Sequence, residues 1–243
     1  MLIEACVGSY EDAVMAAEGG ADRLEFNSAL ALGGLTPSYG AFVLARQAVT
    51  IPIIAMVRPR PGGFSYSEEE KAVMLADAQF LLDQGADGLV FGCLKEDGCL
   101  DEDANRALID LCHKAGKEAV FHRAFDVAAD PWTAVADLAV WGCDRILTSG
   151  QAVTAPEGAD LLARLIQTYG DKIEFCLGSG VNANNALALA NQTGANQLHA
   201  SFGKWRQDKT SHGQGGVDFG SGSQGDYQAL DISKLKAMVD LFK

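Results

Sequence analysis

Short apolar runs of strand length alternate along this chain with longer stretches in which apolar residues recur every three or four positions. The longer stretches have the periodicity of amphipathic helices. The short runs include residues 2–7, 53–57, 118–122 and 173–177, which have strand length and are rich in residues that favour strands. The pattern predicts a regular alternation of strands and helices.

A short phrase occurs four times, each time between a helix-like stretch and a further apolar run. Its copies read Gly-Ala-Asp-Arg-Leu, Gly-Ala-Asp-Gly-Leu, Gly-Cys-Asp-Arg-Ile and Gly-Ala-Asn-Gln-Leu, and they begin at Gly20, Gly85, Gly142 and Gly194. Glycine supplies the left-handed residue that ends a helix, and Asp or Asn suits the tight turn into a strand. The copies lie 65, 57 and 52 residues apart, which is about twice one strand–helix unit. The repeat therefore predicts eight strand–helix pairs.

Helix-start signals follow most of the predicted strands. They occur at Ser9, Thr36, Ser67, Asp130, Thr154 and Asn182. Eight alternating pairs over 243 residues are typical of a closed parallel barrel, the (β/α)8 or TIM-barrel fold of the α/β class. An open doubly wound sheet is the alternative, but it usually has fewer strands and gives no reason for an even repeat. We expect a single TIM-barrel domain over residues 1–243.

Composition and charge narrow the function classes. Hydrophobic residues make up 48% of the chain, which is enough for a large core, and no apolar run reaches 18 residues. The N-terminus lacks the profile of a signal peptide, so we expect a cytoplasmic protein. The 19 basic and 32 acidic residues give a net charge of −13, which opposes binding to nucleic acid or anionic membranes. Any anionic ligand must therefore meet a local basic cluster.

The six cysteines do not form the pattern of a disulfide framework, because they are scattered over different predicted elements of a long chain. No Cys-x-x-Cys or His-rich tract is present, which argues against a closed structural zinc site. Strand parity places Cys6 and Cys176 inside the barrel. Thiolates suit cuprous copper, so both are candidate metal ligands, although buried cysteines more often serve as small apolar packing residues.

Residues 203–228 break the pattern, because they are rich in Gly, Ser, Gln and Asp. A segment of this length after the last strand is unusual in a compact domain. It is either a disordered loop or a functional element, namely a flap over the barrel mouth or an arm across a dimer contact. Residues 231–243 then predict a closing helix with one apolar face.

Polar residues gather where the predicted strands end, which is where the functional groups of this fold lie. A Gly-Ser-Gly turn before a helix start at Asn182 presents backbone N–H groups to a phosphate or carboxylate. Arginines at neighbouring strand ends add permanent positive charge, although rim salt bridges are the plainer interpretation of each one. The predicted anion-binding residues are Arg58, Arg60, Arg123, Ser149, Gly178, Ser179, Gly180 and Ser201.

Two histidines, His122 and His199, end strands and face the barrel interior by parity. Such residues transfer protons near neutral pH or bind metals, although a lone one is more often a hydrogen-bonded core histidine. Together with Glu25 and Asp126 they are the candidate catalytic residues.

Glu25 has a second interpretation. Parity places it inside the barrel with Glu4 and Arg23. Buried charges must be paired, so the three residues are expected to form a structural ion network. A general base at Glu25 is the alternative.

Several strings resemble the CutC family. They are Glu-Ala-Cys-Val at 4–7, Leu-Gly-Gly-Leu-Thr-Pro-Ser at 32–38, Arg-Pro-Arg at 58–60, Phe-His-Arg-Ala-Phe-Asp at 121–126 and Arg-Ile-Leu-Thr-Ser-Gly-Gln at 145–151. The match runs in order from Met1 to about Ser201. The resemblance implies a cytosolic TIM barrel, often a homodimer, with a link to copper homeostasis. Copper(I) is the metal that it implies.

One departure from the family affects the copper site. The resemblance implies two barrel cysteines as cuprous ligands, one matching Cys6 and the other at the position of Asn27. The Asn27 side chain is a hard, weak donor and cannot replace a thiolate. Cys176 stands where the family more often has Met, another soft donor.

Two functions follow from this chain. The resemblance and Cys6 favour a copper homeostasis protein that binds copper. The polar strand ends favour an enzyme that acts on a small anionic metabolite, for example a phosphorylated one, by acid/base chemistry at the barrel mouth. A scaffold without chemistry leaves the convergent polar residues unexplained.

Overall fold

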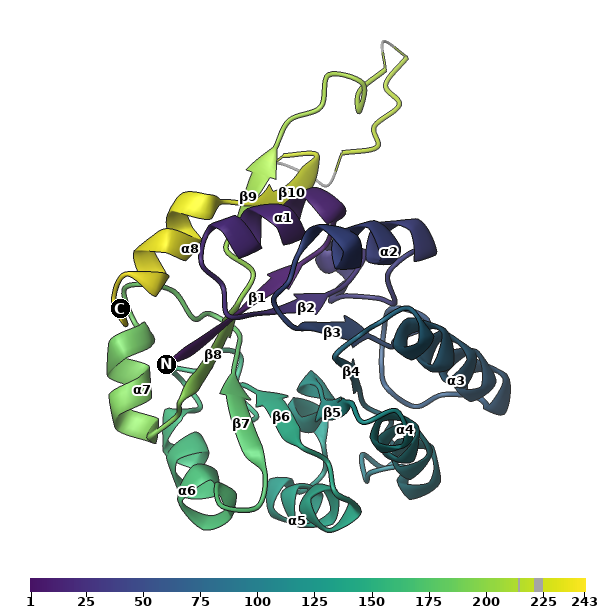
Figure 1. Cartoon of the computed structure of the whole chain (residues 1–243), viewed down its shortest axis with the longest axis vertical. Helices are drawn as coiled ribbons and strands as arrows, with labels where there is room; N and C mark the ends of the chain where they lie inside the picture. Colours follow the sequence, from purple (N-terminus) through teal and green to yellow (C-terminus); the bar gives the residue numbers. More distant parts are fainter. Residues whose placement is uncertain (214, 221–224) are drawn as a thin grey trace.

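The structure is a computed structural model that describes residues 1–213, 215–220 and 225–243. Eight parallel strands close into a barrel in sequence order, as the repeat predicts (Figure 1). The strands are β1 Leu2–Val7, β2 Arg23–Phe26, β3 Ile53–Met56, β4 Gly88–Phe91, β5 Glu118–Phe121, β6 Arg145–Thr148, β7 Glu174–Leu177 and β8 Gln197–Ala200. The fold is a TIM barrel.

Helices surround the ring of strands (Figure 1). They are α1 Tyr10–Glu18, α2 Tyr39–Ala48, α3 Glu68–Asp83, α4 Glu102–Lys114, α5 Pro131–Trp141, α6 Ala159–Tyr169, α7 Ala186–Thr193 and α8 Ile232–Val239, with short 3-10 turns η1 Leu30–Leu32 and η2 Arg123–Val127. Ser9, Ser67 and Asp130 cap their helices as expected. None of the described helices has both the length and the apolar character needed to span a membrane.

The repeated phrase fastens neighbouring strands together. Its glycines all have positive φ, between 75° and 92°. The side chain of Asp22, just before β2, accepts a hydrogen bond from the backbone N–H of Ile3 in β1 at 2.8 Å. Asp87 makes the same contact with Ile53, the first residue of β3, at 3.0 Å, and Asp144 makes it with Ala119, the second residue of β5, at 2.8 Å. Each Asp therefore fixes the start of an odd strand against the even strand that follows it.

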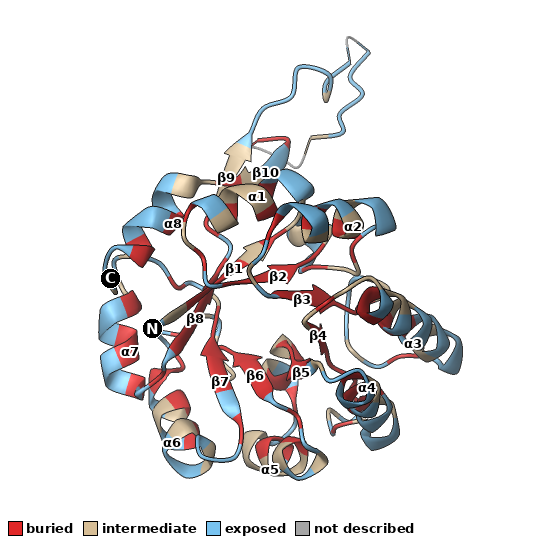
Figure 2. Cartoon of the chain, viewed as in Figure 1, coloured by how far each residue is buried: buried red, intermediate tan, exposed pale blue. Residues whose placement is uncertain are grey.

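The barrel has an outer apolar layer and a largely polar interior. Side chains such as Leu24 and Phe26 point outward and pack in the main core beneath the helices, and the strands are almost entirely buried (Figure 2). A small apolar cluster is separate from this core and comes from β3, β4 and β5: Ile54, Met56, Val90 and Val120. On the opposite strands, inward positions carry buried charged and polar groups.

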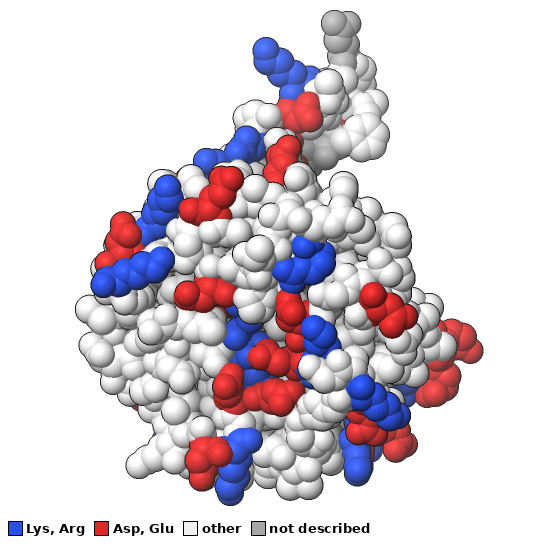
Figure 3. Space-filling model, viewed as in Figure 1, with Lys and Arg blue, Asp and Glu red and all other residues white. Residues whose placement is uncertain are grey.

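Charges of both signs are interleaved on the face of the molecule in Figure 3, over the centre of the ring as well as at its edge. The net charge of −13 is therefore not gathered into one acidic patch on this face.

Residues 203–230, which contain the predicted loop 203–228, include two strands that the sequence did not predict. β9 Gly203–Arg206 pairs antiparallel with β10 Tyr227–Leu230, and the described part of their connection extends outward from the ring, beyond α1 (Figure 1). The backbone N–H of Leu230 anchors the ribbon to the Asp12 carboxylate of α1 at 2.8 Å. The described tip therefore does not form a flap over the mouth, whereas Gly203 and Gln228 at the base of the ribbon line the cavity at the strand ends. Residues 214 and 221–224 of the predicted loop lie outside the described residues.

Candidate functional site

A cavity of about 860 Å³ opens at the carboxyl ends of the strands. Residues from the ends of β1, β2, β3, β5, β6, β7 and β8 line it, so segments far apart in the sequence meet there. The predicted site residues that line it are Cys6, Glu25, Arg58, His122, Arg123, Asp126, Ser179, Gly180, His199 and Ser201. Four others, namely Arg60, Ser149, Gly178 and Cys176, are not among its lining residues.

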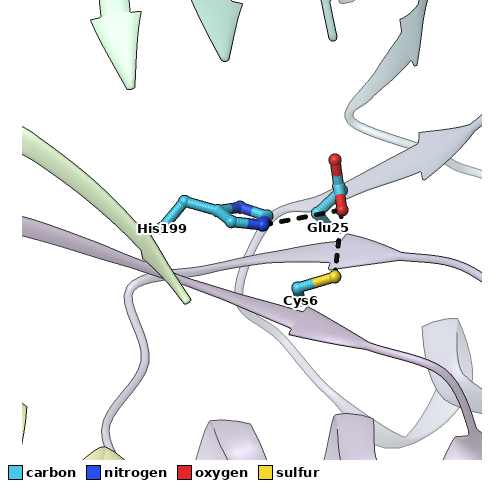
Figure 4. Close-up of side chains that lie close together, drawn as sticks. All are labelled: Cys6, Glu25 and His199. Carbon is cyan, nitrogen blue, oxygen red and sulfur yellow. Dashed lines mark hydrogen bonds and ion pairs between the residues drawn. The ribbon is translucent and has the colours of Figure 1, made fainter. Parts of the chain in front are cut away.

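Strand register brings Cys6, Glu25 and His199 together at one side of the cavity (Figure 4). Cys6 and Glu25 are direct partners across the β1–β2 ladder, and their Sγ and Oε2 atoms lie 3.2 Å apart. The Nε2 atom of His199, from β8, lies 3.9 Å from the same Oε2. One donor atom from each of the three residues falls within 4.8 Å of the others.

Asn27, which the family resemblance marks only as the position of a missing cysteine, completes this cluster. Its amide donates to Oε2 of Glu25 at 2.8 Å and approaches Sγ of Cys6 at 3.5 Å. The other carboxyl oxygen of Glu25, Oε1, is buried without a hydrogen-bond partner. Oε2 is therefore held in place while Oε1 remains available to a ligand.

A buried ion network of Glu4, Arg23 and His199 lies next to the cluster of Cys6, Glu25 and Asn27. Glu4 pairs with Arg23, and its Oε1 lies 2.8 Å from Nδ1 of His199. Burial opposes the charge on Glu4, but Arg23 and His199 outweigh it and hold the pKa of Glu4 well below its usual range. Burial also opposes protonation of His199, yet Glu25 and Glu4 together raise its pKa. The expected network therefore forms from Glu4 and Arg23, whereas Glu25 contacts Cys6 and Asn27 instead of Arg23.

His122 approaches the cavity from the end of β5. Its Nδ1 accepts a hydrogen bond from the backbone N–H of Ala124 at 3.2 Å, and its Nε2 is buried without a partner. Burial, together with the positive charges of Arg58 and Arg123, lowers its pKa to about 3. At neutral pH the ring is therefore uncharged and carries its proton on Nε2.

The arginines behave differently from one another. The Arg58 guanidinium is buried, donates to the carbonyls of Leu32, Gly34 and Gly62, and stacks on Phe64 with 5.0 Å to the ring centroid. Its positive charge lies at the cavity wall. Arg60, expected beside it, instead pairs with Glu70 of α3, outside the cavity. Arg60 therefore forms the rim salt bridge that was the plainer interpretation of each arginine, with a carboxylate from the following helix as its partner.

Hydrogen bonds within the protein occupy the Asp126 carboxylate. Its carboxylate accepts hydrogen bonds from the hydroxyls of Thr148 and Ser149, from backbone N–H groups of residues 149 and 151, and from Arg123. Ser149 is fully buried by this arrangement. Asp126 therefore positions the β5 and β6 loops, and Arg123, with a side chain 42% exposed, remains the accessible charge.

The loop after β7 differs from the expected cradle. The N–H of Gly178 is used in pairing with Thr148, and α7 begins at Ala186 with Asn185 as its cap instead of at Asn182. Ser179 and Gly180 line the cavity with φ of 75° and 71°. The described non-glycine residues with positive φ all follow barrel strands at this end: Ala29, Gln151, Ser179 and Phe202. Such backbone conformations concentrate at functional sites.

Comparison with known proteins identifies the family. A model described as "CutC family" matches residues 1–204. The chain belongs to the CutC family. A Treponema denticola protein named family protein CutC is 42% identical over 99% of this chain and 97% of its own length. The human copper homeostasis protein cutC homolog is 38% identical over 98% of this chain and 87% of its own length.

The fold comparison agrees. The crystal structure of CutC from Streptococcus agalactiae superposes with a TM-score of 0.78 and 31% sequence identity, covering 83% of this chain and 98% of that chain. The TIM barrel is therefore shared with a solved CutC structure.

The donor atoms of this CutC chain suit cuprous copper only in part. Cys6 is the one soft donor of the cluster, because Cys176 is buried beside Glu4, 3.8 Å from its Oε1, and not in the group around Cys6. Burial and then the charge of Glu25 raise the pKa of the Cys6 thiol, so it is protonated without metal. Carboxylate and imidazole donors beside a thiol resemble sites for borderline divalent ions more than a thiolate-rich cuprous site.

Proposed function

We propose that this CutC protein is an enzyme that acts on a small anionic metabolite by acid/base chemistry at the barrel mouth. One observation carries the proposal: four residues that line one cavity have a buried polar atom without a partner, and Oε1 of Glu25 and Nε2 of His122 are the two that can act as base and donor. Unsatisfied buried polar groups cost free energy, so their presence here favours a ligand that satisfies them. Glu25 comes from β2 and His122 from the end of β5, so they approach the cavity from different strands.

The charges around the cavity favour an anion. Arg58, Arg123 and Lys234 line it, although the chain as a whole carries a charge of −13. Arg123 is the accessible guanidinium: its Nε donates to Asp126 and its Nη2 to Ser149, which leaves Nη1 for a phosphate or carboxylate. Cytoplasmic location is part of the proposal, because six free cysteines suit a reducing compartment.

Calorimetric titration with glycerol 3-phosphate and 2-phosphoglycolate tests the binding step. We expect binding that weakens about tenfold or more in Arg123→Ala, since a charge-assisted pair is lost. Arg164→Ala is the matched control, because Arg164 stacks on Trp132 outside the cavity. The proposal is contradicted if neither compound binds, or if Arg123→Ala and Arg164→Ala weaken binding equally.

A second function, copper binding, is favoured by the Cys6 thiol, the soft donor among the three donor atoms that lie together. Competition with a cuprous chelator tests it. Copper binding at this site predicts a weaker affinity in Cys6→Ser and an unchanged one in Cys99→Ser, since Cys99 is exposed outside the cavity. Equal affinities in both variants exclude Cys6 as a ligand.

A further inference from the structure

We propose that the acid/base step is proton transfer next to a carbonyl group, with Glu25 as the base and the neutral His122 ring as hydrogen-bond donor to the carbonyl oxygen. The inference rests on the proposed function and names its substrate class: a small aldehyde, ketone or keto acid that carries a phosphate or carboxylate group and has hydrogen on the carbon beside the carbonyl.

The hydrogen bonds of His122 fix its role. A backbone N–H can only donate, so Nδ1 must accept from Ala124, and the ring proton is on Nε2. That N–H has no partner and belongs to a side chain whose residue is only 4% exposed. The donor is therefore preorganised toward the cavity. The Phe64 ring packs against the imidazole in an edge-to-face arrangement, with 4.9 Å between centroids, and helps to hold the imidazole plane.

A neutral donor suits an oxygen that becomes negative during the reaction. Burial and the adjacent Arg58 and Arg123 keep the pKa of His122 near 3, so the ring does not deliver its proton as an imidazolium acid. Its fixed dipole and the positive charges beside it instead stabilise developing negative charge on the substrate.

Glu25 has the complementary arrangement. Asn27 and Cys6 donate to Oε2, which fixes the carboxylate plane, and Oε1 is left for the substrate. The Cys6 thiol lies 3.2 Å from Oε2 and donates to it. It therefore acts as a donor to Glu25 and does not compete as a base.

The proton balance is simple. Oε1 of Glu25 takes a proton from the carbon beside the carbonyl, and the electron pair of the broken C–H bond forms the C=C bond of an enolate. The carbonyl π electrons move to the oxygen, which accepts the hydrogen bond from His122. Return of the proton from Glu25 to carbon restores the carbonyl compound. No oxidant, reductant or metal is required.

Hydrogen–deuterium exchange tests this step. The protein is incubated in D2O with dihydroxyacetone phosphate, glycolaldehyde phosphate or pyruvate, and the α-hydrogen signal is followed by proton NMR. We expect exchange with at least one compound, reduced about 100-fold or more in Glu25→Gln. Because that variant removes a charge, its folding is checked by thermal unfolding, and Glu25→Asp, which keeps the carboxylate but withdraws it, is expected to be slowed as well.

Two variants of His122, one with an amide at the place of Nε2 and one without, test the role of the Nε2 hydrogen-bond donor. A glutamine amide reaches the place of Nε2, whereas an asparagine amide reaches only that of Nδ1. His122→Gln is expected to retain at least about a tenth of the exchange rate, and His122→Asn to lose about 100-fold. Equal loss in both variants, with binding intact, overturns the role of His122.

The outcomes separate the two proposals. If the carbonyl compounds bind without catalysed exchange, or if Glu25→Gln does not change the exchange rate, this inference is wrong while the proposed anion-binding site is unaffected. Absence of binding removes both.

Discussion

Sγ of Cys6 lies 3.2 Å from Oε2 of Glu25, and the two residues are register partners on β1 and β2. A thiol can donate to a carboxylate, whereas a thiolate beside it is repelled. Burial and the Glu25 charge therefore both raise the pKa of Cys6. The contact between the two residues therefore keeps the Cys6 thiol protonated.

Removing the Glu25 charge is expected to make Cys6 more reactive. In Glu25→Gln the rate of Cys6 alkylation at pH 8 should rise about tenfold for each pKa unit removed, since the thiolate is the nucleophile. Mass spectrometry after limited iodoacetamide treatment measures it. The exposed Cys99 is the internal reference, and its rate should not change. An unchanged rate at Cys6 contradicts the predicted coupling.

Gly92 leaves room for His122. A Cβ atom at residue 92 would lie 2.6 Å from Nδ1 of His122, which is too close for any contact. Gly92→Ala is therefore expected to displace the ring, weaken ligand binding and cost about 1–3 kcal/mol of stability. Gly63→Ala is the control, because nothing lies within 4 Å of its Cβ position and binding should be unchanged. A crystal structure with His122 undisplaced would refute the prediction.

His122 is expected to stay neutral down to about pH 4. Its folded pKa of about 3 lies below its ordinary value of 6.5, so the unfolded state binds more protons between these values. Stability is therefore lost as pH falls through this window, with a slope of at most about 1.4 kcal/mol per pH unit from this residue. NMR titration of the ring checks the pKa, and urea unfolding of the wild type and His122→Gln checks the slope. The raised pKa of His199 changes the pH dependence of stability in the opposite sense. A titration midpoint near 6.5 for His122 would disprove the prediction.

Glu4 is expected to be required for folding stability. Glu4→Gln leaves Arg23 buried beside Gln197 with its charge unpaired, and we expect a loss of about 3–5 kcal/mol. Glu102→Gln is the control, because it removes an exposed pair with Arg106 that is worth about 0.5 kcal/mol or less. Chemical denaturation measures both. Similar losses in the two variants would show that the internal network does not stabilise the barrel.

The fold followed from the sequence because the repeated phrase marks real turns. Positive φ at its glycines and the Asp contacts with neighbouring strands are local features that a sequence records directly. Strand parity also placed Glu25 and His199 inside the barrel. These predictions needed only short-range geometry.

The partners of each side chain did not follow, because they depend on barrel register and on loops. Arg60 pairs with Glu70 from the next helix, and Asp126 is saturated by the β6 loop. Asn27 was missed as a member of the cluster because its role depends on its distance to Glu25. The β9–β10 ribbon was missed because its composition is that of a loop.

The carboxylates of Asp22, Asp87 and Asp144 accept hydrogen bonds from strand N–H groups at the amino-terminal rim of the barrel, opposite the cavity. Structural integrity and chemistry are thus assigned to opposite ends of the same strands. Protein engineers could rewrite the loops at the open end while the base keeps the ring closed, which makes this chain a natural starting scaffold for new catalysts.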